Sequence, residues 1–313
     1  MFYLIGLGLS SPKDITLAGL EAIRRSQRVY LEAYTSILME ASTDQLEALY
    51  GKREDGTNIK LQLADREMVE TQSDEILKNA AVDHVSFLVV GDPFGATTHT
   101  DLLLRCKESK IPYKAIHNAS VLNAIGATGL SLYNYGQTVS IPFFIGNWKP
   151  RSWVDRLLDN LSLGLHTLLL LDIKVKEQSE ENLARGRKIY EPPRFMSIPT
   201  AINQLLTSLK PPCPEDSADA APMTEHAPLP VTRLDPDKTL AISVSRLGSS
   251  TQKFCAGSLS QLAQLDAKGF GDPLHSLIII GHRLNPIERD YISQFAVDTD
   301  QWYCLAREQY KCS

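Results

Sequence analysis

Two glycine-containing runs combine residue types that could hold a ligand largely through backbone atoms. They are Phe2–Leu9, with the sequence FYLIGLGL, and Phe87–Ala96, with the sequence FLVVGDPFGA. Each pattern predicts a buried strand followed by glycines, which let a backbone approach a ligand closely. Asp92 could accept a hydrogen bond from a ligand amine or hydroxyl, or could simply cap its own loop. Because ligands of open parallel sheets lie at the carboxyl ends of strands, the two runs together predict a site for a nucleotide-like ligand.

The first glycine turn matches the dinucleotide-binding fingerprint GxGxxG only in part. Gly6 and Gly8 fit, Ser11 stands where the third glycine belongs, and Glu32 lies at the distance expected of a ribose-binding acid. The run Ser11–Asp14 lengthens the turn, although a pyrophosphate needs a helix N-terminus close to it. We therefore expect a ligand without phosphates, and a purely structural turn remains an alternative. A nicotinamide-dependent dehydrogenase is the competing enzyme class.

These runs belong to an alternation of strand and helix patterns that predicts an α/β domain with a mostly parallel sheet and helices on both faces. In this domain, residues 1–136, Asp14 is a candidate helix N-cap. The predicted strands are 3–9, 28–32, 84–90 and 113–117, and the predicted helices are 15–23, 65–79, 97–109 and 121–127.

A second α/β domain is predicted over residues 137–313. Its expected elements are a helix at 153–161 and strands at 167–171, 239–244 and 275–280. Within it, residues 211–238 hold seven of the 17 prolines, six acids and two bases. Prolines this dense remove backbone donors from any ladder or helix interior. We interpret this segment as a surface-exposed, disordered insertion rather than a domain boundary.

Composition excludes several classes of protein. The 313-residue chain carries a net charge of -5, which argues against a protein that wraps nucleic acid over a broad basic surface. It has no run of about 18 to 20 apolar residues and no signal-peptide pattern, so a cytoplasmic location is expected. The five cysteines are never spaced as CxxC and the histidines lack paired ligand spacing, so we predict no disulfide and no metal. The sequence contains no GxSxG nucleophile elbow, so nothing in it indicates covalent catalysis.

The sequence closely resembles the diphthine synthase family, which belongs to the S-adenosylmethionine-dependent methyltransferases of the tetrapyrrole methylase type. The run LLDIKVKEQS followed by GRKIYEPPRFMS, within residues 170–197, is specific to that family rather than to the wider class. The likeness lapses at about 39–60 and 211–238. It extends over residues 1–34, 83–98, 116–127, 167–197, 245–248 and 272–277.

The resemblance implies a two-domain enzyme with S-adenosylmethionine in the cleft between its domains. Most of the matching positions follow predicted strands, as the sheet rule requires. His275 instead begins a strand, where a lone histidine is more often structural than ligand-binding. The implied cofactor contacts are Leu9, Asp92, Gly95, Ser120, Val121, Leu171, Leu247 and His275.

The resemblance also implies the acceptor, which is the modified histidine side chain of elongation factor 2. That side chain carries an amino group and a carboxylate, and successive methylation would place three methyls on nitrogen and, in eukaryotic members, one more as an ester. A sulfonium methyl is already activated, so positioning and water exclusion can suffice and no catalytic residue is assigned. Asp172 could attract an ammonium acceptor or could cap its strand. Relatives form homodimers, and the same is expected here.

Two further interpretations stay open. The stretch Lys174–Arg194 carries six basic and four acidic residues, which would suit docking of the protein substrate or would form an ordinary solvated surface. Arg185, Arg187 and Lys188 would carry the docking. A methyltransferase of the same fold acting on a small molecule, such as a tetrapyrrole, is the second alternative.

Overall fold

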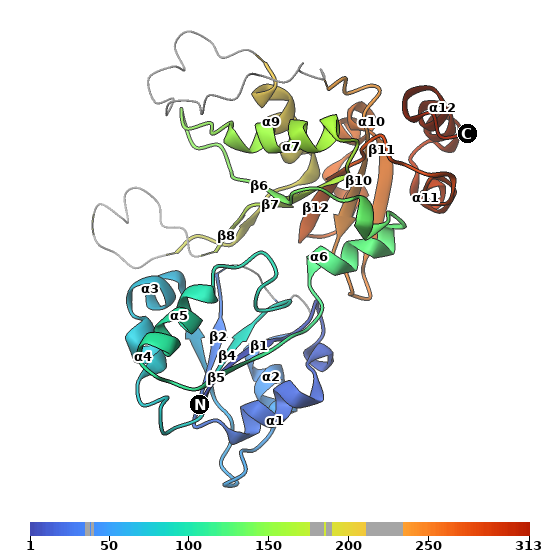
Figure 1. The fold of residues 1–313 in the computed structure, drawn as a ribbon. Coiled ribbons are helices and arrows are strands. Elements are labelled where there is room, and N and C mark those ends of the chain that lie inside the picture. Colours follow the sequence, from blue (N-terminus) through green and yellow to red (C-terminus); the bar gives the residue numbers. More distant parts are fainter. Residues whose placement is uncertain (35–37, 39–40, 176–184, 186–189, 211–233) are drawn as a thin grey trace. The chain divides into compact units, whose positions relative to one another are not determined.

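The computed structural model describes residues 1–34, 38, 41–175, 185, 190–210 and 234–313 (Figure 1). Contacts divide the chain into two compact units. The first unit contains Met1–Ala124, Ile173–Arg194 and Leu247–Ser250, and the second contains Ile125–Asp172, Phe195–Arg246 and Thr251–Ser313. Residues 211–233 of the predicted insertion lie outside the described residues. Leu234–Lys238, which the sequence assigns to the same insertion, belongs instead to the folded second unit, because Leu234 packs into its core.

The first unit is built on a five-stranded sheet in which every pairing is parallel. Side chains alternate between its faces, so Phe2 and Leu4 pack on one side and Tyr3 and Ile5 on the other. The strand order is β3-β2-β4-β1-β5, with β1 (Phe2–Gly6), β2 (Arg28–Glu32), β3 (Leu61–Ala64), β4 (Val85–Val89) and β5 (Tyr113–Ile116).

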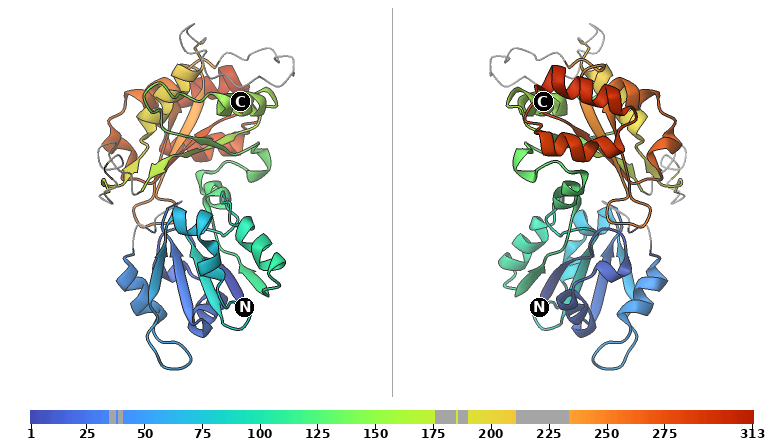
Figure 2. Two further views of the ribbon diagram at one scale, coloured as in Figure 1. Left: turned by 90° about the vertical axis from the view of Figure 1, so that its left-hand side faces the viewer. Right: turned by 90° about the vertical axis from the view of Figure 1, so that its right-hand side faces the viewer.

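Helices cover both faces of this sheet (Figure 2). α1 (Leu17–Arg25) and α2 (Thr43–Tyr50) pack on the Tyr3 face, whereas α3 (Arg66–Thr71), α4 (Ser73–Leu77) and α5 (Thr100–Glu108) pack on the Phe2 face. The neighbouring strands β1 and β4 therefore lead to helices on opposite faces. Such a reversal is the topological switch point at which open α/β sheets bind ligands.

The second unit has a mixed sheet in the order β11-β10-β12-β7-β6. β6 and β7 are parallel, and the other neighbours are antiparallel. Its strands are β6 (Val139–Ile141), β7 (Thr167–Leu171), β10 (Leu240–Ser245), β11 (Lys253–Ser258) and β12 (His275–Ile279), and the two-residue strands β8 (Ile173–Lys174) and β9 (Arg194–Phe195) pair separately.

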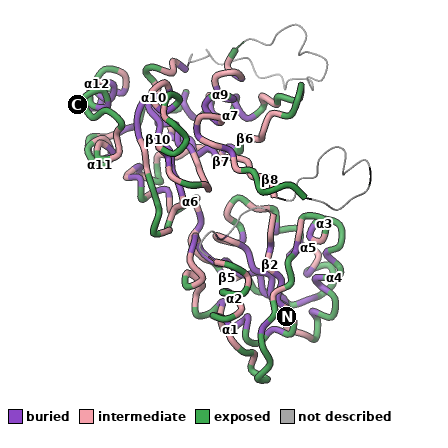
Figure 3. Tube along the Cα trace, turned by 180° about the vertical axis from the view of Figure 1, so that it is seen from behind, coloured by how far each residue is buried: buried purple, intermediate pink, exposed green. Residues whose placement is uncertain are grey.

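Helices also flank the second sheet. One face packs against α7 (Ser152–Ser162), α9 (Ile198–Ser208) and α10 (Leu259–Gln264). α12 (Thr299–Tyr310) contacts β10 and β11, and α11 (Pro286–Ile292) precedes it in the chain. In both sheets the central strands are buried (Figure 3). Among the described residues, no helix is long and apolar enough to cross a membrane.

Several predicted boundaries were wrong in detail. Asp14 is not the N-cap of the first helix, because α1 begins at Leu17 and the Thr16 side chain accepts from Gly19 N at 3.0 Å. The predicted helix 65–79 divides at Gln72 into α3 and α4. The sequence did not predict α2, β3, β6, β11, α10 and α11, which have eight residues or fewer and carry little periodic signal, nor the longer helices α9 and α12.

Candidate functional site

The two glycine turns singled out in the sequence are hydrogen-bonded to each other at the carboxyl ends of β1 and β4. Leu7 N donates to Val89 O at 2.8 Å, Gly8 N to Gly91 O at 3.2 Å, and Gly91 N to Gly8 O at 2.7 Å. Since β1 and β4 flank the switch point, the joined turns lie where an α/β sheet binds its ligand. Their backbones thus form one rigid support.

Glycine is required at two positions of this support because other atoms occupy the space of a side chain. A Cβ on Gly6 would lie 2.6 Å from the carbonyl oxygen of Gly91. A Cβ on Gly95 would lie 2.8 Å from the Cβ of Ser120. Each glycine therefore permits a close approach between segments that are distant in the sequence.

The Asp92 carboxylate joins the glycine loop to the segment that follows β5. Its Oδ1 accepts from Phe94 N at 2.9 Å, and its Oδ2 accepts from Asn118 N at 3.0 Å and lies 2.9 Å from His117 Nδ1. The loop-capping role considered from the sequence is therefore real. A carboxylate offers about four lone-pair sites, so an acceptor position remains for a ligand.

Asn118 is a positioning residue that the sequence did not single out. Its Nδ2 donates to Gly6 O at 3.0 Å and to Asp14 O at 2.9 Å, which ties the segment after β5 to the first turn. Nearby, Ser120 N donates to Asn123 Oδ1 at 2.8 Å, and α6 (Val121–Ala124) begins at the next residue. Among the described residues, the Ser120 hydroxyl has no hydrogen-bond partner. The only sequence signal for Asn118 was its place in the polar run after a predicted strand.

A third segment reaches this edge of the first unit from far along the chain. Ser10 Oγ donates to Gly248 O at 3.0 Å, and a Cβ on Gly248 would lie 2.8 Å from Leu9 Cδ1. Asp14 supports the first turn by accepting from the backbone N–H groups of Ser10 and Ser11, each at 3.0 Å. Six predicted cofactor residues thus share this edge or the segment packed on it, namely Leu9, Asp92, Gly95, Ser120, Val121 and Leu247.

The other two predicted cofactor residues share one edge of the second sheet. Leu171 ends β7, and Ser276 of the antiparallel β12 pairs with Leu170. The start of β12 therefore lies beside the end of β7. This register supplies the physical reason, missing from the sequence, for finding His275 next to Leu171.

The His275 ring is neutral at physiological pH. The pKa of this ring is lowered to about 4, mainly by burial. The positive charge of Arg246 also lowers the pKa, and its effect is larger than the opposite effect of Asp272. Among the described residues, its buried Nδ1 has no hydrogen-bond partner. Several other buried side-chain atoms of the described residues share this property, so on its own it only leaves a hydrogen-bonding position open at His275.

Asp172 anchors the strand end beside Leu171. Its backbone N donates to Ile141 O at 3.1 Å, and its Oδ2 accepts from Phe143 N at 3.0 Å. These contacts fit the strand-capping interpretation of this residue. Arg187 and Lys188 of the proposed basic docking stretch lie outside the described residues.

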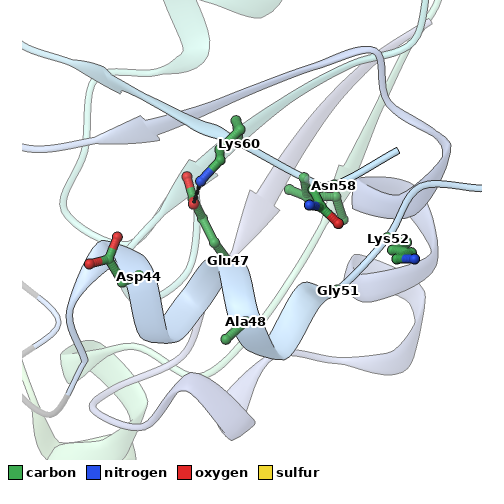
Figure 4. Close-up of a pocket in the computed structure, with 8 residues that line it drawn as sticks. Asp44, Glu47, Ala48, Gly51, Lys52, Asn58 and Lys60 are labelled. Atoms are coloured by element: carbon green, nitrogen blue, oxygen red, sulfur yellow. Dashed lines mark hydrogen bonds and ion pairs between the residues drawn. The ribbon is translucent and has the colours of Figure 1, made fainter. Parts of the chain in front are cut away.

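A hollow of about 420 Å³ lies in the first unit against α2, away from the carboxyl edge of its sheet (Figure 4). It borders the start of β3, at the amino end of the first sheet. Glu47 within it is already bound by Lys60 Nζ at 2.6 Å and Leu61 N at 2.8 Å. Its position and its internal ion pair do not suit the predicted ligand. Within the described part of the chain, no group of three His, Cys, Asp or Glu side chains could hold a metal.

Strand order separates this fold from a dinucleotide-binding fold. In that fold the second strand lies beside the first, which brings its terminal acid to the glycine turn. Here β4 lies between β1 and β2, so Glu32 is two strand spacings, roughly 9–10 Å, from the end of β1. The topology therefore argues against the dehydrogenase alternative.

Comparison with known proteins gives a consistent family. The profile of the Tetrapyrrole (Corrin/Porphyrin) Methylases matches residues 1–206. Diphthine methyl ester synthase of Saccharomyces cerevisiae is 54% identical over 302 residues, which cover 96% of this chain and 91% of that protein. The enzyme of the same name from Yarrowia lipolytica is 52% identical over 305 residues, covering 97% and 92%.

Solved structures agree with the sequence relatives. The crystal structure of an Entamoeba histolytica protein assigned as a diphthine synthase matches with a TM-score of 0.75 and 37% identity, covering 95% of this chain and 99% of that one. A second crystal structure, of a diphthine synthase, matches with a TM-score of 0.72 and 26% identity over 97% and 99%. The chain therefore belongs to the diphthine methyl ester synthase family, within the tetrapyrrole methylases.

Proposed function

We propose that this chain is an S-adenosylmethionine-dependent methyltransferase of diphthamide biosynthesis. It methylates the modified histidine side chain of elongation factor 2, first on the amino group and then on the carboxylate as a methyl ester. One structural observation carries the proposal: the hydrogen-bonded pair of glycine turns at the switch point between β1 and β4. The choice of acceptor rests on the 54% identity to a diphthine methyl ester synthase.

The residues at both edges suit S-adenosylmethionine. Asp92 keeps an acceptor position for an amine or hydroxyl, and the Ser120 hydroxyl lacks a partner within the described residues. His275 presents a buried polar atom on a neutral ring, which adds no positive charge beside a sulfonium. We propose that the remaining contacts come from Leu9, Gly95, Val121, Leu171 and Leu247.

The bound cofactor would supply a methyl group already activated by a positively charged sulfur. The protein then has to hold the acceptor in line, about 3 Å from that methyl, and to exclude water. A carboxylate attacks as it stands, whereas an amine must first lose a proton, so a single dedicated base would serve only some of the steps. Asp172 is engaged by the Phe143 backbone, and we assign it an anchoring role and no catalytic one.

Two further properties accompany this proposal. We propose that the protein acts in the cytoplasm, where elongation factor 2 works, and that it forms a homodimer, as the resemblance to diphthine synthases implies. Sedimentation equilibrium measures the second property directly. A mass of twice 34.8 kDa supports it, and a mass of 34.8 kDa at micromolar concentration contradicts it.

The decisive experiment is mass spectrometry of elongation factor 2 that carries the unmethylated intermediate, after incubation with this protein and S-adenosylmethionine. We expect mass gains in steps of one methyl on the modified histidine peptide, and a fourth gain that mild base removes as an ester. Elongation factor 2 without the modification is the matched control and should gain nothing. No gain despite measured cofactor binding would transfer the proposal to a small-molecule acceptor.

A further inference from the structure

We infer that the hairpin of residues 142–151, between β6 and α7, is a docking element that contacts the acceptor protein (Figure 1). The inference rests on the proposed function and adds a recognition surface to it. The tip of the hairpin carries Ile145 and Trp148, and its base begins at the end of β6.

The tip is held in one conformation by its own backbone. Ile145 N donates to Trp148 O at 3.1 Å, and Trp148 N donates to Ile145 O at 2.8 Å. Gly146, the first residue of the two-residue turn between them, has a φ of 53°, which a side-chain-bearing residue adopts only with strain. Glycine at this position is typical of tight hairpin turns. These hydrogen bonds therefore fix the backbone that carries the apolar side chains of the tip before any partner binds.

The base of the hairpin is fastened to buried groups of the second unit. Gln204 is 7% exposed, and its amide accepts from Phe144 N at 3.2 Å and donates to Pro142 O at 2.7 Å. Trp153 Nε1 donates to Pro150 O at 2.9 Å on the other side of the loop. A loop fastened at both ends loses little conformational entropy when a partner binds it.

The tip exposes a tryptophan, whereas the other two tryptophans of the chain are buried. The chain has three tryptophans, and Trp153 and Trp302 are 4% and 1% exposed. Trp148 is 55% exposed and Ile145 is 53% exposed. Tryptophan is enriched among the residues that carry most of the binding energy in protein interfaces. A fastened, exposed tryptophan beside an exposed isoleucine is thus suited to a protein partner.

The place of the hairpin connects it with methyl transfer. Ile141, the last residue of β6, pairs with Leu171 at the end of β7. The hairpin therefore leaves the sheet at the edge that holds Leu171 and His275, both proposed to contact the cofactor. A partner side chain that reaches Leu171 would therefore lie near the base of the hairpin.

The charge of the hairpin favours the acceptor over a second copy of this chain. Residues 138–154 include Lys149 and Arg151 but no acid, in a chain whose net charge is -5. The acceptor side chain carries a carboxylate until the ester forms, so a basic surface beside it assists approach. A two-fold pairing through the same tip would instead bring like charges together.

The test uses the full-length protein and elongation factor 2 carrying the intermediate. The variant Ile145→Ser with Trp148→Ser removes the apolar tip, and Val82→Ser with Tyr113→Ser is the matched control. The control pair is 81% and 45% exposed and lies at the amino ends of β4 and β5. We expect the tip variant to raise KM for the protein at least tenfold, with kcat, the Kd for S-adenosylmethionine and the oligomeric state unchanged. The control should match the wild type.

A second variant addresses the charge with little risk to folding. Lys149→Glu changes one exposed side chain, and it should raise KM several-fold at low ionic strength and less at high salt. If the tip variant has the same KM as the wild type, the docking inference is wrong. The proposed function is unaffected by that result, because it depends on the activity of the wild-type protein. Loss of kcat or of cofactor affinity would place the hairpin in the transfer site itself, and a changed oligomeric state would make it an interface between copies. Either result also overturns the docking role, whereas an inactive wild type would refute the proposed function instead.

Discussion

The two sheet edges that hold the candidate cofactor residues are built in different ways. In the first unit, turns after parallel strands meet through backbone hydrogen bonds, and glycines keep them close. In the second unit, the edge combines the end of β7 with the start of the antiparallel β12, and it contributes side chains. A parallel sheet gathers only strand ends at one edge, whereas a mixed sheet adds strand starts. The rule that ligand residues follow strands is therefore complete only for the first kind of sheet.

Acid should reveal the largest difference between the units. Burial lowers the pKa of His166 and His275 in the second unit, and of His99 in the first, to about 4 from an ordinary 6.5. In the unfolded chain these histidines bind a proton already near pH 6.5, whereas in the folded chain they do so only near pH 4. The free energy of unfolding is therefore at its full value above pH 6.5 and falls as the pH drops towards 4. Each histidine contributes a slope of about 1.4 kcal/mol per pH unit over that window, less for the partly exposed His275.

Hydrogen exchange read by mass spectrometry, corrected for intrinsic rates, measures the opening free energy of each unit between pH 7 and pH 4. We expect the second unit to lose stability faster than the first. His166 Nδ1 accepts from Gly281 N at 3.0 Å, which holds the ring neutral although Glu288 lies 4.0 Å from Nε2. Equal slopes in the two units would show that Glu288 offsets the cost of charging His166.

A single methyl group should damage the backbone-built edge. Gly6→Ala places a Cβ against Gly91 O, a backbone atom that cannot rotate away. We expect a loss of about 1–3 kcal/mol in the free energy of unfolding, measured by urea denaturation, together with weaker S-adenosylmethionine binding. Gly269→Ala is the matched control, because its Cβ would meet Leu265 Cβ at 3.8 Å, an ordinary contact. Equal stability of the two variants would contradict the close packing of the turns.

Loss of one side chain should affect the second edge more mildly. We expect His275→Ala to weaken S-adenosylmethionine binding about tenfold, or about 1.4 kcal/mol, in isothermal titration calorimetry. His282→Ala, an exposed histidine of the same unit, should leave the Kd unchanged. A wild-type Kd for His275→Ala would return His275 to a purely structural role and would restrict the proposed contacts of this edge to Leu171.

Strong local patterns predicted the first unit well. The near-continuous apolar character of β1 and β4 and the glycines after them marked both strands and both turns. Sequence patterns did not reveal elements that are short or polar, such as α2 and β3. They also gave the wrong N-cap for α1, because both Asp14 and Thr16 can cap a helix and the structure uses Thr16. Asn118 escaped notice because its function depends on two carbonyl oxygens more than a hundred residues away in the chain.

The sequence alone determined the α/β class of the first unit, its two glycine turns and the resemblance to diphthine synthases, because periodicity and motifs are local properties. Tertiary structure decided the strand order, which places β4 beside β1 and separates Glu32 from the first turn. It also decided that Gly248 meets Leu9 and that the start of β12 meets the end of β7. Long-range pairing depends on which buried faces and registers fit together. That fit is a property of the folded chain, and no single segment records it.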